Sequence, residues 1–282
     1  MRNFEINIEL VRKLIDTQFP QWSHLHIRSV ENEGNDNRTF HLGNIMSVRL
    51  PSAERYASQV EKENYWLPKL APHISIPITT PRAIGKPDFG YPFAWAVNKW
   101  IEGTPLSIND TNKGQIAIDL AKFLRELQGI ECTNNLFAGE HNFYRGGDLF
   151  VYNCEVQTAL TKLVKDVDTQ ICKQIWEKAL SSKWHKQAVW VHGDVAIGNL
   201  LQCNNVLSGV IDFGILGAGD PACDLVMAWT YFDDSSRAIF MQEMAMDSDT
   251  WDRARGWALW KALITYDNES SKQVVRALEE GY

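Results

Sequence analysis

The chain has 282 residues, 45% hydrophobic and 22% charged, which is the composition of an ordinary globular protein with room for one large domain or two smaller ones. Its formal net charge of −7 argues against a nucleic-acid binder, which usually has a basic surplus. No stretch approaches the roughly 18 consecutive apolar residues of a membrane span, and the start, MRNFEINIEL, carries acids where a signal peptide would be apolar. We therefore expect a cytoplasmic protein with no nucleic-acid or membrane partner.

The five cysteines are widely scattered and include no C-x-x-C pair. Zinc sites and redox couples use closely spaced pairs, so this pattern favours reduced, structural thiols. The residues concerned are Cys132, Cys154, Cys172, Cys203 and Cys223.

The first part of the chain is predicted to form two helices and a small antiparallel sheet. Apolar residues recur at helical spacing over residues 4–19, and Pro20 closes that segment. A second helical pattern runs from Ser52, the predicted N-cap, to Pro68. Short apolar runs between Asn-, Asp- and Gly-rich segments predict strands over residues 25–30, 38–42, 45–50, 74–79 and 92–101.

After the turn at residues 102–105 the pattern becomes mainly helical. Apolar residues on one helical stripe predict a helix over residues 115–130. Two short apolar strands follow much later, near residues 190 and 210. Longer helical patterns surround these strands, over residues 153–181, 222–246 and 250–280.

This order of elements predicts an α+β fold of two lobes, with a strand-rich lobe over residues 1–103 and a helix-rich lobe over residues 104–282. The net charge is +1 over the first range and −8 over the second, which together give −7. The acidity of the second lobe suits a cationic ligand, and a solvated acidic surface would give the same balance.

The strongest chemical signal is WVHGDVAIGNLL at residues 190–201, followed by GVIDFG at residues 209–214. These stretches place Asp194, Asn199 and Asp212 beside apolar runs that are typical of buried strands. Carboxylate and amide oxygens suit Mg²⁺, which usually completes its shell with water and substrate phosphates. Each residue alone is compatible with a turn cap or a strand end, but the combined spacing favours a phosphate-binding metal site.

The pattern H-G-D-x-x-x-x-N followed by I-D-F-G resembles the catalytic and metal-binding motifs of the protein kinase superfamily. The form HGD, with Gly193 where protein kinases have Arg, and GDPACDLVMAW at residues 219–229 are similar to the aminoglycoside phosphotransferase and choline kinase branch. A protein kinase needs a long activation segment after I-D-F-G, whereas Asp224 follows Gly214 within ten residues. The resemblance implies a bilobal protein-kinase-like fold that transfers the γ-phosphoryl of ATP, or of GTP, to a hydroxyl of a small molecule.

The resemblance also implies a role for each residue of the motif. Asp194 accepts the proton of the acceptor hydroxyl, and His192 fixes the loop that carries it. Asn199 and Asp212 hold Mg²⁺, and Asp224 braces the loop. The first lobe is then the nucleotide-binding lobe, and the second is the catalytic and substrate-binding lobe.

The nucleotide side departs from the family pattern. The family's strand Lys, which contacts the α and β phosphates, is replaced by Arg49 in SVRLP; Glu63 is the helix partner by spacing, with Glu61 as the alternative. No G-x-G-x-x-G motif is present, so the polar loop at residues 31–40 is the candidate phosphate cover, through Asn35, Asn37, Arg38 and Thr39. The hinge residues expected to meet adenine are Lys99, Trp100 and Ile101.

The acceptor is predicted to be cationic, as an aminoglycoside or a related aminocyclitol would be. Residues 230–252 contain six acids and one Arg, and Asp233 and Asp234 are the predicted substrate residues, although solvated helix ends would give the same cluster. Macrolides, choline-like amines and methylthioribose remain open as acceptors. A pseudokinase that binds nucleotide without catalysis also remains open, because of Arg49. The chain is expected to act as a monomer or a homodimer.

Overall fold

The computed structural model describes residues 5–30, 36–132 and 136–281. The chain divides into two compact units, one formed by Met1–Gly103 with Ser208–Gly214 and the other by Thr104–Leu207 with Ile215–Tyr282. The boundary predicted after Gly103 leaves Ser208–Gly214 in the second lobe, whereas the structure places this segment in the first unit. Backbone hydrogen bonds explain the difference, because Val210 N donates to Pro77 O (2.9 Å) and Thr79 N donates to Val210 O (3.3 Å).

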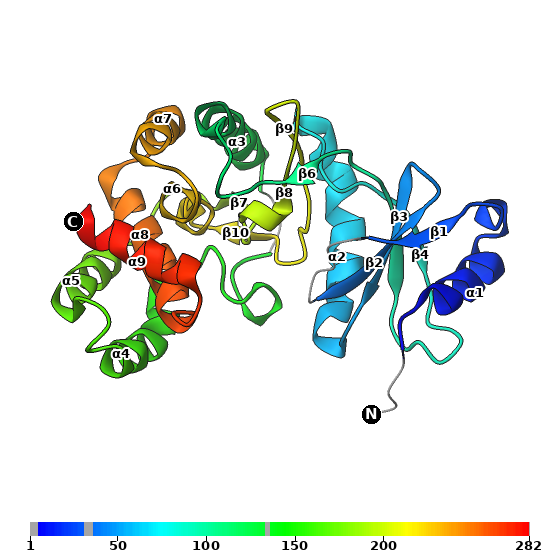
Figure 1. Ribbon diagram of the computed structural model, residues 1–282, viewed down its shortest axis with the longest axis horizontal. Helices are drawn as coiled ribbons and strands as arrows, with labels where there is room; N and C mark the ends of the chain where they lie inside the picture. The colour runs from blue at the N-terminus through cyan, green and yellow to red at the C-terminus, as the bar shows by residue number, and fades with distance from the viewer. Residues whose placement is uncertain (1–4, 31–35, 133–135, 282) are drawn as a thin grey trace. The chain divides into compact units, whose positions relative to one another are not determined.

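The first unit contains a five-stranded antiparallel sheet in the order β1-β2-β3-β5-β4, blue to cyan in Figure 1. Two helices accompany this sheet, α1 (Ile8–Gln18) and α2 (Glu54–Leu70). The strands are β1 (Ile27–Ser29), β2 (Asn37–Leu42), β3 (Met46–Pro51), β4 (Pro81–Gly85) and β5 (Trp95–Lys99).

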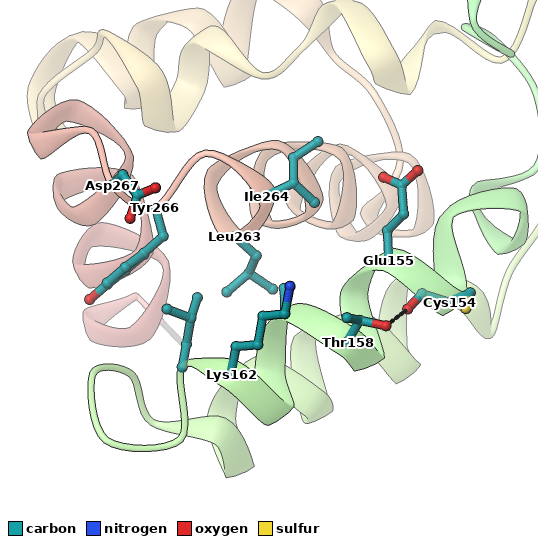
Figure 2. Close-up of a pocket in the computed structure, with 10 residues that line it drawn as sticks. Cys154, Glu155, Thr158, Lys162, Leu263, Ile264, Tyr266 and Asp267 are labelled. Atoms are coloured by element: carbon teal, nitrogen blue, oxygen red, sulfur yellow. Dashed lines mark hydrogen bonds between the residues drawn. The ribbon is translucent and has the colours of Figure 1, made fainter.

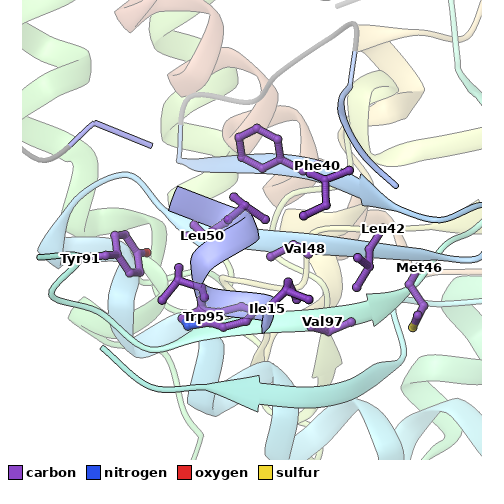
Figure 3. Packing of buried hydrophobic residues seen from close by; sticks show 12 residues of the cluster. Ile15, Phe40, Leu42, Met46, Val48, Leu50, Tyr91, Trp95 and Val97 are labelled. Atoms are coloured by element: carbon purple, nitrogen blue, oxygen red, sulfur yellow. The ribbon is translucent and has the colours of Figure 1, made fainter. Parts of the chain in front are cut away.

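A hydrophobic core joins α1 to one face of this sheet. Figure 3 shows Ile15 of α1 among side chains of β2, β3 and β5, including Phe40, Val48 and Trp95. Side chains alternate between the two faces of a strand, so Arg49 points away from Val48 and towards α2. The alternation along β3 therefore places a charged group on the α2 side of the sheet.

Two details of α2 differ from the prediction. The N-cap is Ala53, without a side-chain capping bond, because the Ser52 hydroxyl donates to the carbonyl oxygen of Asp36 (2.9 Å). Pro68 lies inside the helix, which continues to Leu70. Leu67 and Leu70 are both buried, and their packing offsets the hydrogen bond that proline cannot make.

The strand predicted over residues 74–79 is wrong. Within this segment, among the described residues, only Ile78 forms a bridge, with Val210. The sheet instead takes β4, which the sequence did not indicate because it begins at a proline and ends at a glycine. Gly85 is required there, since a Cβ would lie 1.9 Å from the Trp95 ring on the neighbouring strand.

The second unit is mainly helical, and its strands form short ladders. β7 (Val189–Val191) pairs with β10 (Gly217–Gly219), and β6 (Thr104–Pro105) pairs with β8 (Leu200–Cys203), both antiparallel. β9 (Val206–Val210) crosses from the second unit into the first. The helices are α3 (Lys113–Gly129), α4 (Asn153–Lys162), α5 (Thr169–Leu180), α6 (Met227–Thr230), α7 (Asp234–Met244), α8 (Ser248–Ile264) and α9 (Glu269–Glu280).

Each long helical pattern of the sequence is divided into separate helices, and α9 begins after Asn268 without a side-chain capping bond. Asp168 starts α5 by accepting from the backbone of residues 170 and 171, and Asp233 and Asp247 cap α7 and α8. None of the five cysteines, all of which the structure describes, forms a disulfide; Cys172 and Cys223 are buried, whereas Cys154 and Cys203 are exposed. Within the described ranges, no helix has the length and apolarity needed to cross a membrane.

Candidate active site

The HGD loop follows β7 and is fixed by a buried carboxylate. Asp224 Oδ2 accepts from His192 N (2.7 Å) and Asp224 Oδ1 accepts from Gly193 N (2.8 Å). Asp224 is fully buried, and burial raises the pKa of its carboxyl while these two backbone bonds act against that rise. The two bonds hold the loop at its base and leave Asp194, the next residue, exposed.

His192 is also fully buried, and its Nδ1 lies 3.2 Å from the backbone N of Asp194. A backbone N–H can only donate, so Nδ1 accepts and the ring proton of a neutral imidazole is on Nε2. His192 therefore acts on Asp194 through the backbone, and its side chain is inside the loop.

Gly193 occupies a backbone position that a side chain would strain. Its φ is +85°, and a Cβ would lie 2.8 Å from the carbonyl oxygen of Ile215 and 3.2 Å from Arg145 Cβ. The Arg of protein kinases therefore has no room at this position.

Gly193→Ala should lower the free energy of unfolding by about 1–3 kcal/mol, because alanine at positive φ is strained and its methyl group meets a backbone oxygen. Gly198→Ala is the matched control, since a Cβ there meets nothing within 4 Å. Urea unfolding of both variants checks this expectation. Equal stability of Gly193→Ala and Gly198→Ala would contradict it.

Asp194 and Asn199 are in direct contact, which the sequence spacing alone does not establish. Asn199 Nδ2 donates to Asp194 O (2.9 Å) and to Asp194 Oδ2 (3.1 Å). The short helical turn Ile197–Asn199 brings the two side chains together. Asn199 thus turns its nitrogen towards Asp194 and its amide oxygen away from it.

Arg145 supports the same loop, and sequence reasoning missed it. Arg145 Nε donates to the carbonyl oxygen of Gly193 (2.9 Å), and its guanidinium carbon lies 5.1 Å and 4.8 Å from the ring centres of Trp257 and Trp260. Arg145 Nη1 is buried and has no hydrogen-bond partner among the described residues. Such a donor costs about 1–3 kcal/mol. No motif marks this position, which precedes the loop by 48 residues.

The first unit contains a buried ionic cluster around Arg49. Arg49 Nη1 donates to both carboxylate oxygens of Glu63 (2.9 and 3.0 Å), and Arg49 Nη2 donates to Asp212 Oδ1 (2.5 Å). With its amide oxygen turned towards the guanidinium, Asn37 accepts from Arg49 Nη2 (2.8 Å) and Nε (3.1 Å). The structure therefore brings together four of the predicted residues and selects Glu63, not Glu61, as the partner of Arg49.

Burial and the neighbouring charges shift the pKa values of Arg49 and Glu63. Burial acts to lower the pKa of Arg49, but Asp212 and Glu63 outweigh it, so the pKa is raised. Burial raises the pKa of Glu63, and Arg49 acts in the opposite direction. Lys62, the residue before Glu63, was not singled out by the sequence; it is half-buried, and burial lowers its pKa to about 8.

Asp212 has an unusual backbone, with φ at +65°. A non-glycine residue in the left-handed region costs free energy, and such residues cluster at functional sites. Its side chain is 37% exposed, so part of the carboxylate reaches solvent.

The remaining predicted nucleotide residues belong to the first unit as well. Lys99 N donates to Thr80 O and Trp100 N to Ile45 O (both 2.8 Å), so these two hinge amides are already engaged. Ile101 N makes no backbone hydrogen bond within the described part of the chain. Asn35 of the predicted phosphate loop lies outside the described residues.

Residues 27–257 match the sequence model of the phosphotransferase enzyme family. The chain belongs to this family. A search of curated proteins found no match. The fold is the bilobal protein-kinase-like fold that the sequence predicted, as the similarity to solved phosphotransferases shows.

Three solved structures illustrate this similarity. The GDP complex of wild-type aminoglycoside 2'-phosphotransferase-IIIa has a TM-score of 0.72 and 20% identity over 98% of each chain. The streptomycin-ATP-APH(2")-IIa ternary complex has a TM-score of 0.60 and 18% identity, covering 99% of this chain and 97% of the other. Macrolide 2'-phosphotransferase MphH from Brachybacterium faecium has a TM-score of 0.64 and 15% identity, covering 96% and 97%.

The predicted substrate acids of this phosphotransferase have structural partners. Asp233 caps α7, accepting from Ser236 N (2.9 Å) and from the hydroxyls of Ser235 and Ser236 (both 2.8 Å). Asp234 pairs with Arg237 (3.0 Å), and its side chain is 98% exposed. Asp233 is therefore explained by helix capping, and Asp234 by a surface ion pair.

Asp233→Asn should leave the acceptor KM of the phosphotransferase unchanged, because Asn is an equally good N-cap.

Asp233→Ala should lose about 1 kcal/mol of stability, because the N-cap of α7 is removed. The bonds from Ser236 N and the two hydroxyls lower the pKa of Asp233 from 3.8 to about 2. The folded state thus favours the charged form, so this contribution is complete above pH 3.8 and is lost as the pH falls towards 2. Urea unfolding against pH checks the stability, and a raised KM in Asp233→Asn would show that the carboxylate binds the acceptor.

A cavity of about 360 Å³ lies beside Asp194, formed entirely by the second unit. It includes the loop residues 193–197 but neither Asp233 nor Asp234. The other lining residues come mainly from α8, α9 and the segment before α6: Arg145, Cys223, Val226, Thr230, Trp257, Ala258, Trp260, Lys261, Ala262, Thr265, Asn268, Ser270, Ser271 and Val274.

A second cavity of about 480 Å³ lies between α4 and the C-terminal end of α8. Figure 2 shows its lining, with Glu155 and Lys162 on α4 and Leu263 on α8. It contains none of the residues predicted for catalysis, metal or nucleotide. The smaller cavity is therefore the candidate acceptor site of the phosphotransferase, because Asp194 lines it.

Proposed function

We propose that this phosphotransferase is a small-molecule kinase that transfers the γ-phosphoryl group of ATP, or of GTP, to a hydroxyl of an acceptor. The observation that carries the proposal is the braced HGD loop, which presents the exposed Asp194 carboxylate beside Asn199 and at the edge of a cavity. The family supplies the reaction class.

In this reaction, the acceptor oxygen attacks the γ-phosphorus. The bond between the γ-phosphorus and the bridging oxygen of the β-phosphate breaks, which releases the nucleoside diphosphate. Asp194 Oδ accepts the hydroxyl proton and later returns it to solvent. Asn199 holds the carboxylate through Nδ2, and His192 holds the backbone of Asp194. The loop residues thus position a base and do not bond covalently to substrate.

Asn199 and Asp212 fit the two protein ligands of Mg²⁺. The amide oxygen of Asn199 is turned away from Asp194, and the strained Asp212 carboxylate is partly exposed. Amide and carboxylate oxygens are ligands that Mg²⁺ takes, with phosphates and water completing the shell. When bound, the ion would neutralise phosphate charge during transfer.

Arg49, Glu63 and Asn37 are proposed to serve the nucleotide phosphates, with Lys99, Trp100 and Ile101 as the adenine hinge. Every nitrogen of the Arg49 guanidinium already donates to Glu63, Asp212 or Asn37. A phosphate must therefore replace one of these bonds, and exchange with Asp212 would release a metal ligand. The GDP and ATP complexes of the structural relatives support a nucleotide site.

The acceptor class predicted from the acidic second lobe is an aminoglycoside or a related aminocyclitol. The relatives include aminoglycoside and macrolide phosphotransferases, so both classes belong in a first panel. Choline-like amines and methylthioribose have the same kind of acceptor hydroxyl. Of the acids that motivated a cationic acceptor, Asp233 and Asp247 are, however, engaged as helix caps, and Asp234 in an ion pair.

A non-catalytic nucleotide-binding protein is the second candidate, because Arg49 pairs with Asp212, one of the two proposed metal ligands. The test is Mg²⁺-dependent release of ADP and GDP over a panel of aminoglycosides, hygromycin-like aminocyclitols, macrolides, choline and methylthioribose. Acceptor-stimulated release supports the kinase. Mg²⁺-dependent nucleotide binding without release on any hydroxyl compound supports the second candidate.

A further inference from the structure

We infer that the acceptor is a hydroxylated acid, whose hydroxyl meets Asp194 and whose carboxylate is received by Lys261 and Arg145. This inference rests on the proposed kinase function, because it takes Asp194 as the base. It names the acceptor class from the cavity beside that residue and departs from the cationic acceptor that the sequence composition favours.

The charges that line the cavity are the first observation. Among its described lining residues, Asp194 is the only carboxylate, and Arg145 and Lys261 are both cations. The remaining positions are apolar, aromatic, thiol, hydroxyl or amide side chains. The ammonium groups of a polycation would be repelled by the two cations of the lining. The single carboxylate, Asp194, is needed as the base of the reaction and is not available to bind them.

The hydrogen-bonding capacity of the lining is the second observation. Two buried donors of this lining, Arg145 Nη1 and Trp257 Nε1, have no acceptor within the described part of the chain. Both atoms are shielded from solvent by the surrounding protein. A carboxylate has acceptors only, on two oxygens, and it complements donors that an ammonium group cannot serve.

Lys261 gives the cavity a cation that no internal acid neutralises. Its side chain is exposed on α8, and no carboxylate lies within ion-pair distance of it among the described residues. Its nearest ring is that of Trp260, with Nζ 6.0 Å from the ring centre. Glu155 accepts from Trp260 Nε1 (2.8 Å) and lines the other cavity.

The start of α9 adds to this polarity. Asn268, Ser270 and Ser271 line the cavity and belong to the N-cap and first turn of this helix. Asn268 makes no side-chain capping bond, while its carbonyl oxygen accepts from Ser271 N (3.1 Å). The N-terminal end of a helix carries partial positive charge, and it favours an anion next to Lys261.

Three probes with the same aromatic group and closely similar sugar hydroxyls separate the charge classes: 4-nitrophenyl glucuronide, 4-nitrophenyl glucoside and 4-nitrophenyl glucosaminide. They are anionic, neutral and cationic, and their affinities for the full-length protein can be measured by equilibrium dialysis with and without Mg²⁺ and ADP. We expect the glucuronide to bind most tightly and the amine least tightly.

Lys261→Gln should weaken glucuronide binding about five- to tenfold and leave glucoside binding unchanged, since only the charge contact is lost. Lys162→Gln is the matched control, because it removes an exposed lysine from the other cavity, and it should change neither affinity. Tighter binding of the amine, equal affinities for the three probes, no binding of the glucuronide, or an equal effect of the two substitutions would overturn the inference.

Turnover separates this inference from the proposed function. ADP or GDP release measured on the same three probes reports the kinase reaction. Binding in the expected order without release on any probe supports the acidic acceptor and counts against the kinase. Release with the amine in preference to the glucuronide supports the kinase and overturns the acidic acceptor.

Discussion

Asp194→Asn should lower the turnover of acceptor phosphorylation by about 10²- to 10⁴-fold, the usual contribution of a general base. An amide cannot take the hydroxyl proton. It can still accept from Asn199 Nδ2 through its oxygen, and the side chain is exposed, so the fold and nucleotide affinity should be retained. Steady-state kinetics together with calorimetric nucleotide binding measure the two effects separately.

Asp267→Asn is the control for this substitution, since Asp267 is an exposed acid that lines the other cavity. It should turn over at the wild-type rate. If Asp194→Asn also turns over at the wild-type rate, Asp194 is not the base. If it fails to bind nucleotide, or unfolds at lower urea than wild type, the loss has a structural cause and the catalytic assignment fails.

Arg49→Met should lower the free energy of unfolding by about 3–5 kcal/mol, the usual cost of leaving one member of a buried ion pair alone. Glu63 is 4% exposed, and it would keep a charge without the two bonds from Arg49 Nη1. Asn37 and Asp212 would lose a donor as well. Urea unfolding without nucleotide measures the loss.

Two variants distinguish the ion pair from simple packing. Arg49→Met combined with Glu63→Leu should recover part of the loss, because an apolar pair can replace a buried ionic one. Arg49→Lys keeps the charge but loses the fork that serves three partners, so its loss should lie between wild type and Arg49→Met. A single Arg49→Met variant within about 1 kcal/mol of wild type, below the range for a broken buried pair, would show that the cluster contributes little to stability.

The cost of Arg49→Met should also depend on pH. Burial already raises the pKa of Glu63, and removing Arg49 takes away the group that opposes this rise. A raised pKa in the folded state means that stability is present while Glu63 is protonated and is lost as the pH rises through that pKa. The variant should therefore be less destabilised at low pH than at high pH, relative to wild type.

The sequence predicted those helices and loops whose patterns lie within one short stretch of the chain. Helical stripes in the sequence predicted α1, α2, α3, α8 and α9, and the HGD and IDFG motifs predicted the loop and the cluster residue Asp212. The errors in the strand prediction arose because strand formation also depends on which partner strand is available. The run at residues 74–79 has a strand-like sequence but pairs only through Ile78, while β4 has a weak sequence and a ready partner in β5.

The missed site residues depend on tertiary contacts. Arg145 reaches Gly193 from 48 residues away, and nothing in its own segment indicates this. Trp257 and Trp260 have the spacing of core residues and are indeed buried, yet they also line the cavity, together with Arg145 and Lys261. Composition alone cannot tell an N-cap such as Asp233 from an acid that meets a ligand, so the substrate role of the acid cluster stays a prediction.

The most direct test of the account is to detect the phosphorylated acceptor by mass spectrometry after incubation with Mg²⁺ and ATP or GTP, for wild type beside Asp194→Asn. We expect the wild type to convert an acceptor to a product that carries one added phosphoryl group on a hydroxyl, with one nucleoside diphosphate released for each, and Asp194→Asn to form almost none. Equal product from both proteins, or Mg²⁺-dependent nucleotide binding with no phosphorylated acceptor from either, would contradict a kinase that uses Asp194 as its base.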